Sequence, residues 1–511
     1  MSIAANSIFV RLIRNLISWV VRVWNASGVS ALLNRVERGA RAWAGGSGVC
    51  RVIARDGAGL NAWPDSLTCR VVAGVINIPC ALVKWFYKVT HRLWDGSIVF
   101  RFLSPVGTIA WVPLGLLIAV MLCCPHSKWD NLYGFIGVLL VTALFLLGAM
   151  TRSRQRLQVE QLGPYMTLYM AFICYGLLAS FSLSLSMRFF VFHVTCFLIV
   201  LLLVSSIQKY SQLHCMLGIV GAGLLGASFY GCYQSYVGVE VVASLQDLTL
   251  NAGMPGRIYS FFSNPNNFAE ILVMLVPLML ALFINAKSIS GRFLILVVMG
   301  LSVVAIGATY SRSGWIGLVG ALVLFFAFHN WRLVPVLVIV GVAALPFLPE
   351  SIYNRILTIG NMKDSSTRYR FYIYEASENL LRDYGLRGVG LGNDVMREIF
   401  KQYPTMPDGN YPIHTHNNYL QLWVETGFFG MIAYLALMLG HLKSGVKAYV
   451  ASTDKRVKTM LAASLSAMCG ILVVSIAEYT WFYPRNMFLF WFLFGVIAVC
   501  IKLARTPEEA K

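Results

Sequence analysis

Two histidines stand beside two asparagines where a long polar stretch runs into an apolar one, at His414, His416, Asn417 and Asn418. An imidazole titrates at about 6.5, so such a group can take or give a proton during catalysis. We therefore predict that His416 is a general base for an attacking hydroxyl, supported by His414, Asn417 and the lipid-depth carboxyl of Glu425. The alternative is that His416 caps a helix or lies solvated in a loop.

Signatures of metal or nucleotide chemistry are missing from the sequence. The pair His414 and His416 could bind a metal, but no nearby cysteine or carboxylate set completes a tetrahedron. There is no Asp-x-Asp pair, no Walker loop and no G-x-S-x-G elbow. We expect no metal and no cofactor, and these absences argue against a nucleotide-fuelled reaction on the cytoplasmic face.

Three arginines could bind an anion. Arg312 lies between two apolar runs, and its planar guanidinium suits a phosphate group. Arg368 and Arg370 lie in the polar stretch that precedes the histidines. Together with Arg312 they would hold a diphosphate and stabilise the charge that forms as it departs. The alternative is that Arg312 snorkels to the membrane surface and that the other two are ordinary surface arginines.

Two further segments carry weaker signals. Arg257 and Asn264 lie in a polar cluster that enters a helix at Pro265, where turn and cap chemistry is the alternative to a supporting role. Glu478 and Arg485 lie among aromatic residues and look like one charge pair in an interfacial aromatic belt.

The composition shows what must position these groups. Of 511 residues, 58% are apolar and only 12% are charged, too few to give a soluble protein of this size a polar surface. Many apolar runs approach the roughly 20 residues of a bilayer-spanning helix. The predicted fold class is all-α, a polytopic membrane protein. The net charge of +19 lies mainly at helix ends and in the N-terminal region, which indicates membrane orientation and not nucleic-acid binding.

The apolar pattern predicts about twelve spanning helices in a chain of four parts. Residues 1–103 are a basic amphipathic region along the cytoplasmic leaflet, and residues 104–348 carry the first spans. Residues 349–416 form a long outer loop, helical in part, and residues 417–511 hold the last spans and a cytoplasmic tail. The predicted spans are 106–124, 131–150, 163–184, 188–206, 214–236, 264–284, 293–310, 314–329, 333–348, 418–440, 459–479 and 486–503.

Charges in the short loops predict the orientation. The loops 151–156 and 441–458 are rich in arginine and lysine, and an alternating count of spans places both on one side with the two termini. Basic short loops mark the cytoplasmic side. The 349–416 loop therefore faces outward, with the histidines at its end.

The region 259–485 resembles the O-antigen ligase and polymerase family of integral-membrane glycosyltransferases. That family has a histidine followed by Asn, Ser or Gln, nine residues, Gly, two residues, and a small residue or Tyr. The residues that match this spacing are His416, Asn417, Gly427 and Gly430.

Two arginine features extend the resemblance. Thr309–Arg312 is similar to the family's Ser-Arg at the outer end of a helix. Arg370 precedes Gly388-Val389-Gly390 by about eighteen residues, as the outer-loop arginine of the family does, which selects it over Arg368.

The resemblance implies a function. It implies transfer or polymerisation of a glycan from a polyprenyl-diphosphate donor onto a hydroxyl acceptor, metal-independent and inverting, at the outer face of a bacterial plasma membrane. It assigns acceptor activation to His416 and diphosphate binding to Arg312 and Arg370. The implied partners are a lipid-linked oligosaccharide donor, a glycan, lipid or protein acceptor, and membrane lipids, with no nucleic acid.

A second function stays open. The stretches 257–267, 230–231 and 481–485 are similar to a cyanobacterial subgroup of this family that was named as inorganic-carbon transporters, whose members can lack the histidine pair. The alternative is therefore a small-anion, bicarbonate-type transporter or transport-associated protein. A scaffold without catalysis is the third reading. The few charges near the middle of the spans favour the transferase.

Overall fold

The computed structural model describes residues 15, 18–19, 22–48, 51, 55, 62–242, 253–360, 364–407 and 409–505. The chain divides into two units, Met1–Asn61 and Ala62–Lys511. In the first unit, α2 (Gly28–Gly46) begins where the Ser27 side chain accepts a hydrogen bond from the Ser30 N–H. Part of the predicted region 1–103 lies outside the described residues.

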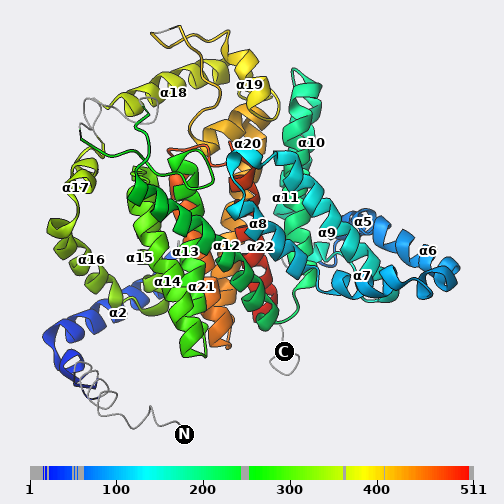
Figure 1. The fold of residues 1–511 in the computed structure, drawn as a ribbon, viewed down its shortest axis with the longest axis horizontal. Helices are drawn as coiled ribbons and strands as arrows, with labels where there is room; N and C mark the ends of the chain where they lie inside the picture. Colours follow the sequence, from blue (N-terminus) through cyan, green and yellow to red (C-terminus); the bar gives the residue numbers. More distant parts are fainter. Residues whose placement is uncertain are drawn as a thin grey trace. The chain divides into compact units, whose positions relative to one another are not determined.

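The described residues of the second unit form helices and loops, with no strand (Figure 1). The all-α prediction is confirmed. Besides three short 3-10 helices, the helices are α5 (Leu67–Ile76), α6 (Ile78–Asp95), α7 (Ile98–Thr108), α8 (Trp111–Cys123), α9 (Asn131–Thr151), α10 (Pro164–Leu178), α11 (Leu183–Ser206), α12 (Tyr210–Val237), α13 (Pro265–Asn285), α14 (Ile289–Ala308), α15 (Arg312–Asn330), α16 (Leu333–Ala344), α17 (Glu350–Leu357), α18 (Ser365–Tyr384), α19 (Asn393–Phe400), α20 (Asn418–Ala451), α21 (Lys455–Val474) and α22 (Pro484–Arg505).

Nine helices among the described residues are long and apolar enough to cross a membrane, and up to twelve spans result if each bent pair counts as one. The nine correspond to nine of the predicted spans. The most enclosed are α22 and α13, whose apolar windows are 94% and 83% buried. A bundle with such central helices is a multi-pass membrane protein.

Three predicted spans take a different form. The span 106–124 is the end of α7 and all of α8, which meet at an 80° bend with Pro105 and Pro113 on either side. The span 163–184 is shortened because α10 ends at Leu178, where the Ser180 hydroxyl bonds to Ser182 and Ser186.

The third altered span is 333–348. Here α16 ends at Ala344, and the chain turns by 118° through a 3-10 helix into α17. Pro346 and Pro349 interrupt the helical hydrogen bonding at this point. The turn sends α17 away from the bundle direction and begins the long polar segment.

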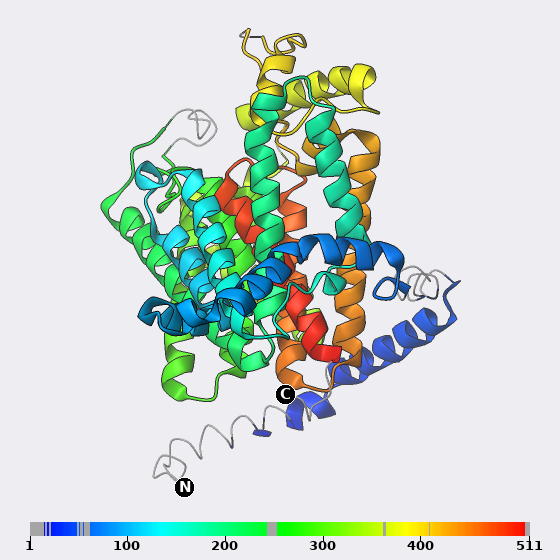
Figure 2. The same cartoon turned by 90° about the vertical axis from the view of Figure 1, so that its right-hand side faces the viewer.

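That polar segment holds α17, α18 and α19, so the predicted helical content of the 349–416 loop is confirmed. Both views place α18 and α19 at one end of the bundle, whereas the end of α22 and the connection between α20 and α21 lie at the other (Figures 1 and 2). The side chains of α18 and α19 bury Leu380, Met396 and Phe400 together with Val424 of α20. This small core fixes the polar segment on the bundle.

Backbone pairing completes that attachment. Within α20, Gly427 has φ 75°, and the helix breaks there. The Val389 and Gly390 N–H groups donate to the carbonyls of Val424 and Glu425, at 2.8 and 3.1 Å. A Cβ on Gly388, itself at φ 78°, would lie 2.6 Å from the Gly427 nitrogen. The two glycine motifs found in the sequence are therefore one structural unit.

Two other glycines bring α15 close to α21. A Cβ on Gly317 would lie 3.0 Å from the Gly470 carbonyl oxygen, and one on Gly470 would lie 2.7 Å from that of Gly317. Small residues at such a contact let helix backbones approach closely inside a membrane. The contact matters for the polar end of the bundle, because α15 begins at Arg312 and α21 leads into the loop with Glu478.

We expect Gly317→Val to destabilise the protein by about 1–3 kcal/mol, because the added side chain must push α15 away from α21. Gly320→Val is the matched control, since a Cβ on that glycine of the same helix meets no atom within 4 Å. The thermal unfolding midpoint in detergent measures the difference. Equal midpoints for the two variants would show that the close approach does not matter.

Candidate functional site

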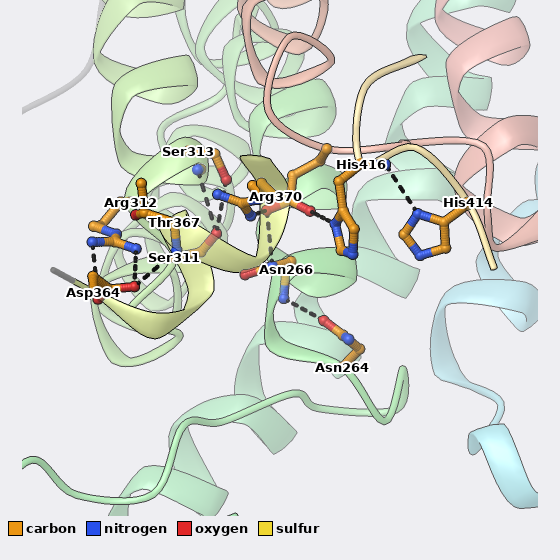
Figure 3. Close-up of polar contacts among 12 residues, drawn as sticks. Asn264, Asn266, Ser311, Arg312, Ser313, Asp364, Thr367, Arg370, His414 and His416 are labelled. Carbon is orange, nitrogen blue, oxygen red and sulfur yellow. Dashed lines mark hydrogen bonds and ion pairs between the residues drawn. The ribbon is translucent and has the colours of Figure 1, made fainter. Parts of the chain in front are cut away.

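The Glu478 carboxylate lies at the centre of a polar cluster. Its Oε1 accepts hydrogen bonds from Arg370 Nη2 and, at 3.0 Å, from Asn266 Nδ2. Its Oε2 lies 3.5 Å from Nδ1 of His416. The Glu478 side chain is 7% exposed, and that of His416 is 29% exposed. One buried carboxylate thus joins the predicted base to a predicted diphosphate ligand, and Figure 3 shows Arg370 between Arg312 and His416.

Charge keeps Glu478 ionised. Burial alone would raise the pKa of its carboxyl, but the Arg370 guanidinium and the His416 ring outweigh burial and lower that pKa to about 2. A buried carboxylate is stable only with such partners. The pairing also corrects the sequence interpretation, because Glu478 is paired with Arg370, not Arg485. Arg485 donates instead to the Cys124 and Phe261 carbonyls, at 2.8 and 3.2 Å.

His416 is held just outside a helix. Asn417 is the N-cap of α20, and its Oδ1 accepts from the N–H groups of Tyr419 and Leu420 at 2.9 and 3.0 Å. The Asn418 N–H donates to the Ser475 carbonyl at 2.9 Å, which ties this helix start to the loop carrying Glu478. His416 itself has φ 49°, a left-handed conformation that is uncommon outside glycine.

His414 supports the conformation of His416. The two rings are 4.1 Å apart between centroids, and the His416 N–H donates to His414 Nδ1 at 3.2 Å. Phe482 packs 4.5 Å from the His414 ring. Burial, and then the nearby His416, holds the pKa of His414 well below its usual range. His414 is therefore a neutral hydrogen-bond acceptor that positions its neighbour.

Arg312 belongs to a second ion-pair group. Its Nη2 lies 3.2 Å from Oδ1 of Asp364, and its Nη1 donates to the Thr358 carbonyl at 2.9 Å. Arg355 Nη1 lies 3.5 Å from Oδ2 of the same aspartate, which is 1% exposed. The Asp364 carboxylate also accepts from the Thr367 N–H at the start of α18. Arg312 therefore anchors the helix that carries Arg370.

Arg257 links the two groups. Its Nη2 donates to Asn266 Oδ1 at 2.7 Å, and its Nε donates to the Thr309 carbonyl at 2.8 Å. Burial, followed by the charge of Arg355, lowers the pKa of Arg257 to about 9, so it stays a cation near neutral pH. We call Arg257, Arg312, Arg355 and Arg370 the arginine cluster.

The arginine cluster gathers positive charge in one place. Among the described residues, its four guanidiniums are ion-paired with or close to two carboxylates, Asp364 and Glu478. Concentrated positive charge with little exposure favours an anionic ligand. A diphosphate has both the charge and the acceptor oxygens that such forks bind.

Backbone strain gathers in the same segments. The non-glycine residues with positive φ in the described ranges are Ser260, Ser263, Tyr310 and His416. Ser260 is near Arg257 in the sequence, Ser263 precedes Asn264, and Tyr310 is near Arg312. All of these residues, with the histidine pair, lie in the segments that form the site. Such strained residues persist where the surrounding structure fixes them and are common at functional sites.

Some candidate residues lie outside this arrangement. Arg368 is exposed on α18, and its side chain makes no polar contact with the described residues of the site. Glu425 is buried on α20, where it accepts from Gln421 at 2.7 Å and from the Tyr479 hydroxyl at 3.3 Å. Asn264 caps α13 by accepting from the Asn266 N–H at 2.8 Å, the alternative weighed from the sequence.

Sequence reasoning missed Asn266, Arg355 and Asp364, and it paired Glu478 with the wrong arginine. The first three lie in polar stretches without periodicity of their own. Glu478 did carry a signal, as a carboxylate at the end of the predicted span 459–479 that the alternating count places on the same side as His416. Its partner could not be read, because Arg370 is 108 residues away.

A family comparison covers most of these residues. Residues 297–435 match the family model described as O-antigen ligase, and this range contains Arg312, Asp364, Arg370 and His416. No curated protein matches the chain. Residues 297–435 therefore form an O-antigen ligase domain, which supports a relation to the O-antigen ligase and polymerase family and, in general terms, to glycan ligation or polymerisation.

Proposed function

We propose that the protein transfers or polymerises a glycan from a polyprenyl-diphosphate donor onto an acceptor hydroxyl. One observation carries the proposal: the predicted base His416 and the predicted diphosphate ligand Arg370 meet on one buried carboxylate, close to further guanidiniums. The prenyl chain of the donor would lie among the apolar helices, with its diphosphate at the arginine cluster. The acceptor is a glycan, a lipid or a protein.

The proposed reaction needs a base for the acceptor hydroxyl and cations that stabilise the negative charge of the departing diphosphate. The acceptor oxygen attacks the anomeric carbon, the bond from that carbon to the diphosphate oxygen breaks, and the configuration inverts. The hydroxyl proton passes to Nε2 of His416, because Nδ1 faces Glu478. Glu478 orients the ring and stabilises the imidazolium, as the carboxylate of a catalytic triad does. The arginine cluster stabilises the departing diphosphate, so the mechanism is metal-independent.

The orientation follows from charge. We infer that the end of the bundle with α18 and α19 faces outward from a bacterial plasma membrane and that both termini are cytoplasmic. The basic short loops, which include the connection from α20 to α21, support this orientation. Exposed Leu82, Trp85 and Val89 recur along α6 and support an interfacial N-terminal region within residues 1–103.

His416→Ala should reduce glycan transfer by at least about 100-fold, because no other group of the site is placed to take the hydroxyl proton. The assay uses proteoliposomes and lipid-linked oligosaccharide extracted from the native host. His91→Ala, which removes an exposed histidine of α6, should retain activity. Full transfer by His416→Ala would refute the mechanism, and bicarbonate uptake that survives the substitution would favour the transporter.

Arg370→Lys should reduce transfer by at least about tenfold, since an ammonium cannot reproduce the two-pronged contact of a guanidinium. Arg382→Lys is the matched control on the same helix, where Arg382 forms an exposed pair with Glu378. Initial rates at saturating donor compare the two variants. Equal rates would remove Arg370 from the proposed diphosphate site.

Acid should weaken the site through Glu478. Because the folded-state pKa of this carboxyl is depressed to about 2, its stabilising effect is complete above the ordinary glutamate value of 4.5 and is lost as the pH falls through the folded-state value. The difference in unfolding midpoint between the wild type and Glu478→Gln should therefore shrink between pH 4.5 and 2. Scanning fluorimetry in detergent measures it. A difference that stays constant over this range would contradict the pairing.

A further inference from the structure

One carboxylate serves both functional groups of the site. Arg370 and Asn266 occupy Oε1 of Glu478, whereas the contact from Oε2 to His416 Nδ1 is the longest of the three, at 3.5 Å. The strongest partner of Glu478 in this structure is therefore the guanidinium. The same guanidinium is needed for the donor diphosphate.

The second ion-pair group behaves differently. Asp364 contacts Arg312 and also Arg355, so it keeps a guanidinium partner when Arg312 turns to a ligand. Glu478 has no such reserve among the described residues. When Arg370 turns to a ligand, the remaining polar partners of Glu478 are the neutral amide of Asn266 and the His416 ring. Of the two carboxylates, Glu478 is the one that contacts His416. A change in its arginine partner can therefore change the charge next to the base.

The other groups around His416 do not compete for this role. Tyr374 of α18 donates to the His416 carbonyl at 3.5 Å, and burial raises the pKa of its hydroxyl, which stays neutral. His414 is a buried neutral acceptor, as its lowered pKa indicates. Arg257 is fixed by Asn266 and by a backbone carbonyl. Glu478 and Arg370 are the charged side chains that can exchange partners next to the ring.

We propose that donor binding shifts Glu478 from Arg370 to His416, so that the base is strengthened only when the diphosphate is in place. The inference rests on the proposed function and deepens it. Without donor, the guanidinium and the carboxylate neutralise each other. A bound diphosphate takes over the guanidinium, the carboxylate turns to Nδ1, and the proton affinity of Nε2 rises. The acceptor hydroxyl is then deprotonated only in the presence of donor.

The first test is binding of farnesyl diphosphate, a short soluble probe, to the full chain in nanodiscs. Glu478→Gln should bind it at least about threefold more tightly than the wild type, because the carboxylate no longer competes for Arg370. The same variant should lose glycan transfer. Glu378→Gln, which removes an exposed carboxylate of α18, is the control and should leave both properties unchanged. A glutamate with a purely structural role would weaken binding and transfer together when substituted.

The second test uses no ligand, and its decisive comparison, Arg370→Gln against the wild type, does not need Glu478→Gln to fold. In Arg370→Gln, Glu478 has lost its guanidinium partner and pairs with His416. We therefore expect a larger fraction of the His416 ring to be protonated than in the wild type. Modification of His416 by diethyl pyrocarbonate at neutral pH, resolved by tandem mass spectrometry, should then be several-fold slower than in the wild type. Adding Glu478→Gln to this variant should largely restore the rate. An unchanged rate in Arg370→Gln would overturn the proposal.

The outcomes separate this inference from the proposed function. If farnesyl diphosphate fails to bind the wild type, or binds equally well to Arg370→Gln, the diphosphate site itself is wrong. If binding depends on Arg370 but weakens in Glu478→Gln, the diphosphate site stands and the exchange of partners is refuted.

Discussion

The carboxylate of Glu478 is the interaction on which the polar end of this protein depends. It lies in the loop before α22 and gathers groups from α13, α18 and the start of α20. A carboxylate removed from water needs cationic or hydrogen-bonding partners, and a cation beside a membrane has the same need. The mutual requirement brings segments together that apolar packing alone would leave without a fixed register.

The helices supply what this pairing needs. The glycine contact between α15 and α21 sets the spacing between the helix that begins at Arg312 and the helix that leads to Glu478. The buried side chains of α18 and α19 hold the polar segment on α20. Rigid elements on each side let a few polar groups keep the geometry that acid–base chemistry requires. The strained backbone at His416 is maintained by the same surroundings.

Much of this arrangement could be predicted from the sequence, and the limits have physical causes. Apolar length located the nine long helices, and helical periodicity located α18, because both signals are local. The bend between α7 and α8 was not predicted, because a continuous run of apolar residues does not reveal where a helix changes direction. The convergence of Arg370 and His416 was expected, but their link through Glu478 was not. Ion pairs between distant segments leave no period in a sequence, and an isolated glutamate among aromatic residues resembles an ordinary interfacial residue.

The broken helix α20 has an evolutionary consequence. At Gly427 the helix gives up its own hydrogen bonds, and the backbone of Val389 and Gly390 replaces them. A Cβ on Gly427 would overlap the Leu386 carbonyl oxygen, and one on Gly388 would lie 2.6 Å from the Gly427 nitrogen, so a substitution at either glycine lacks a local remedy. The two stretches should therefore co-vary among relatives. An insertion between them would be tolerated only if it preserved the backbone hydrogen bonds that pair the two stretches.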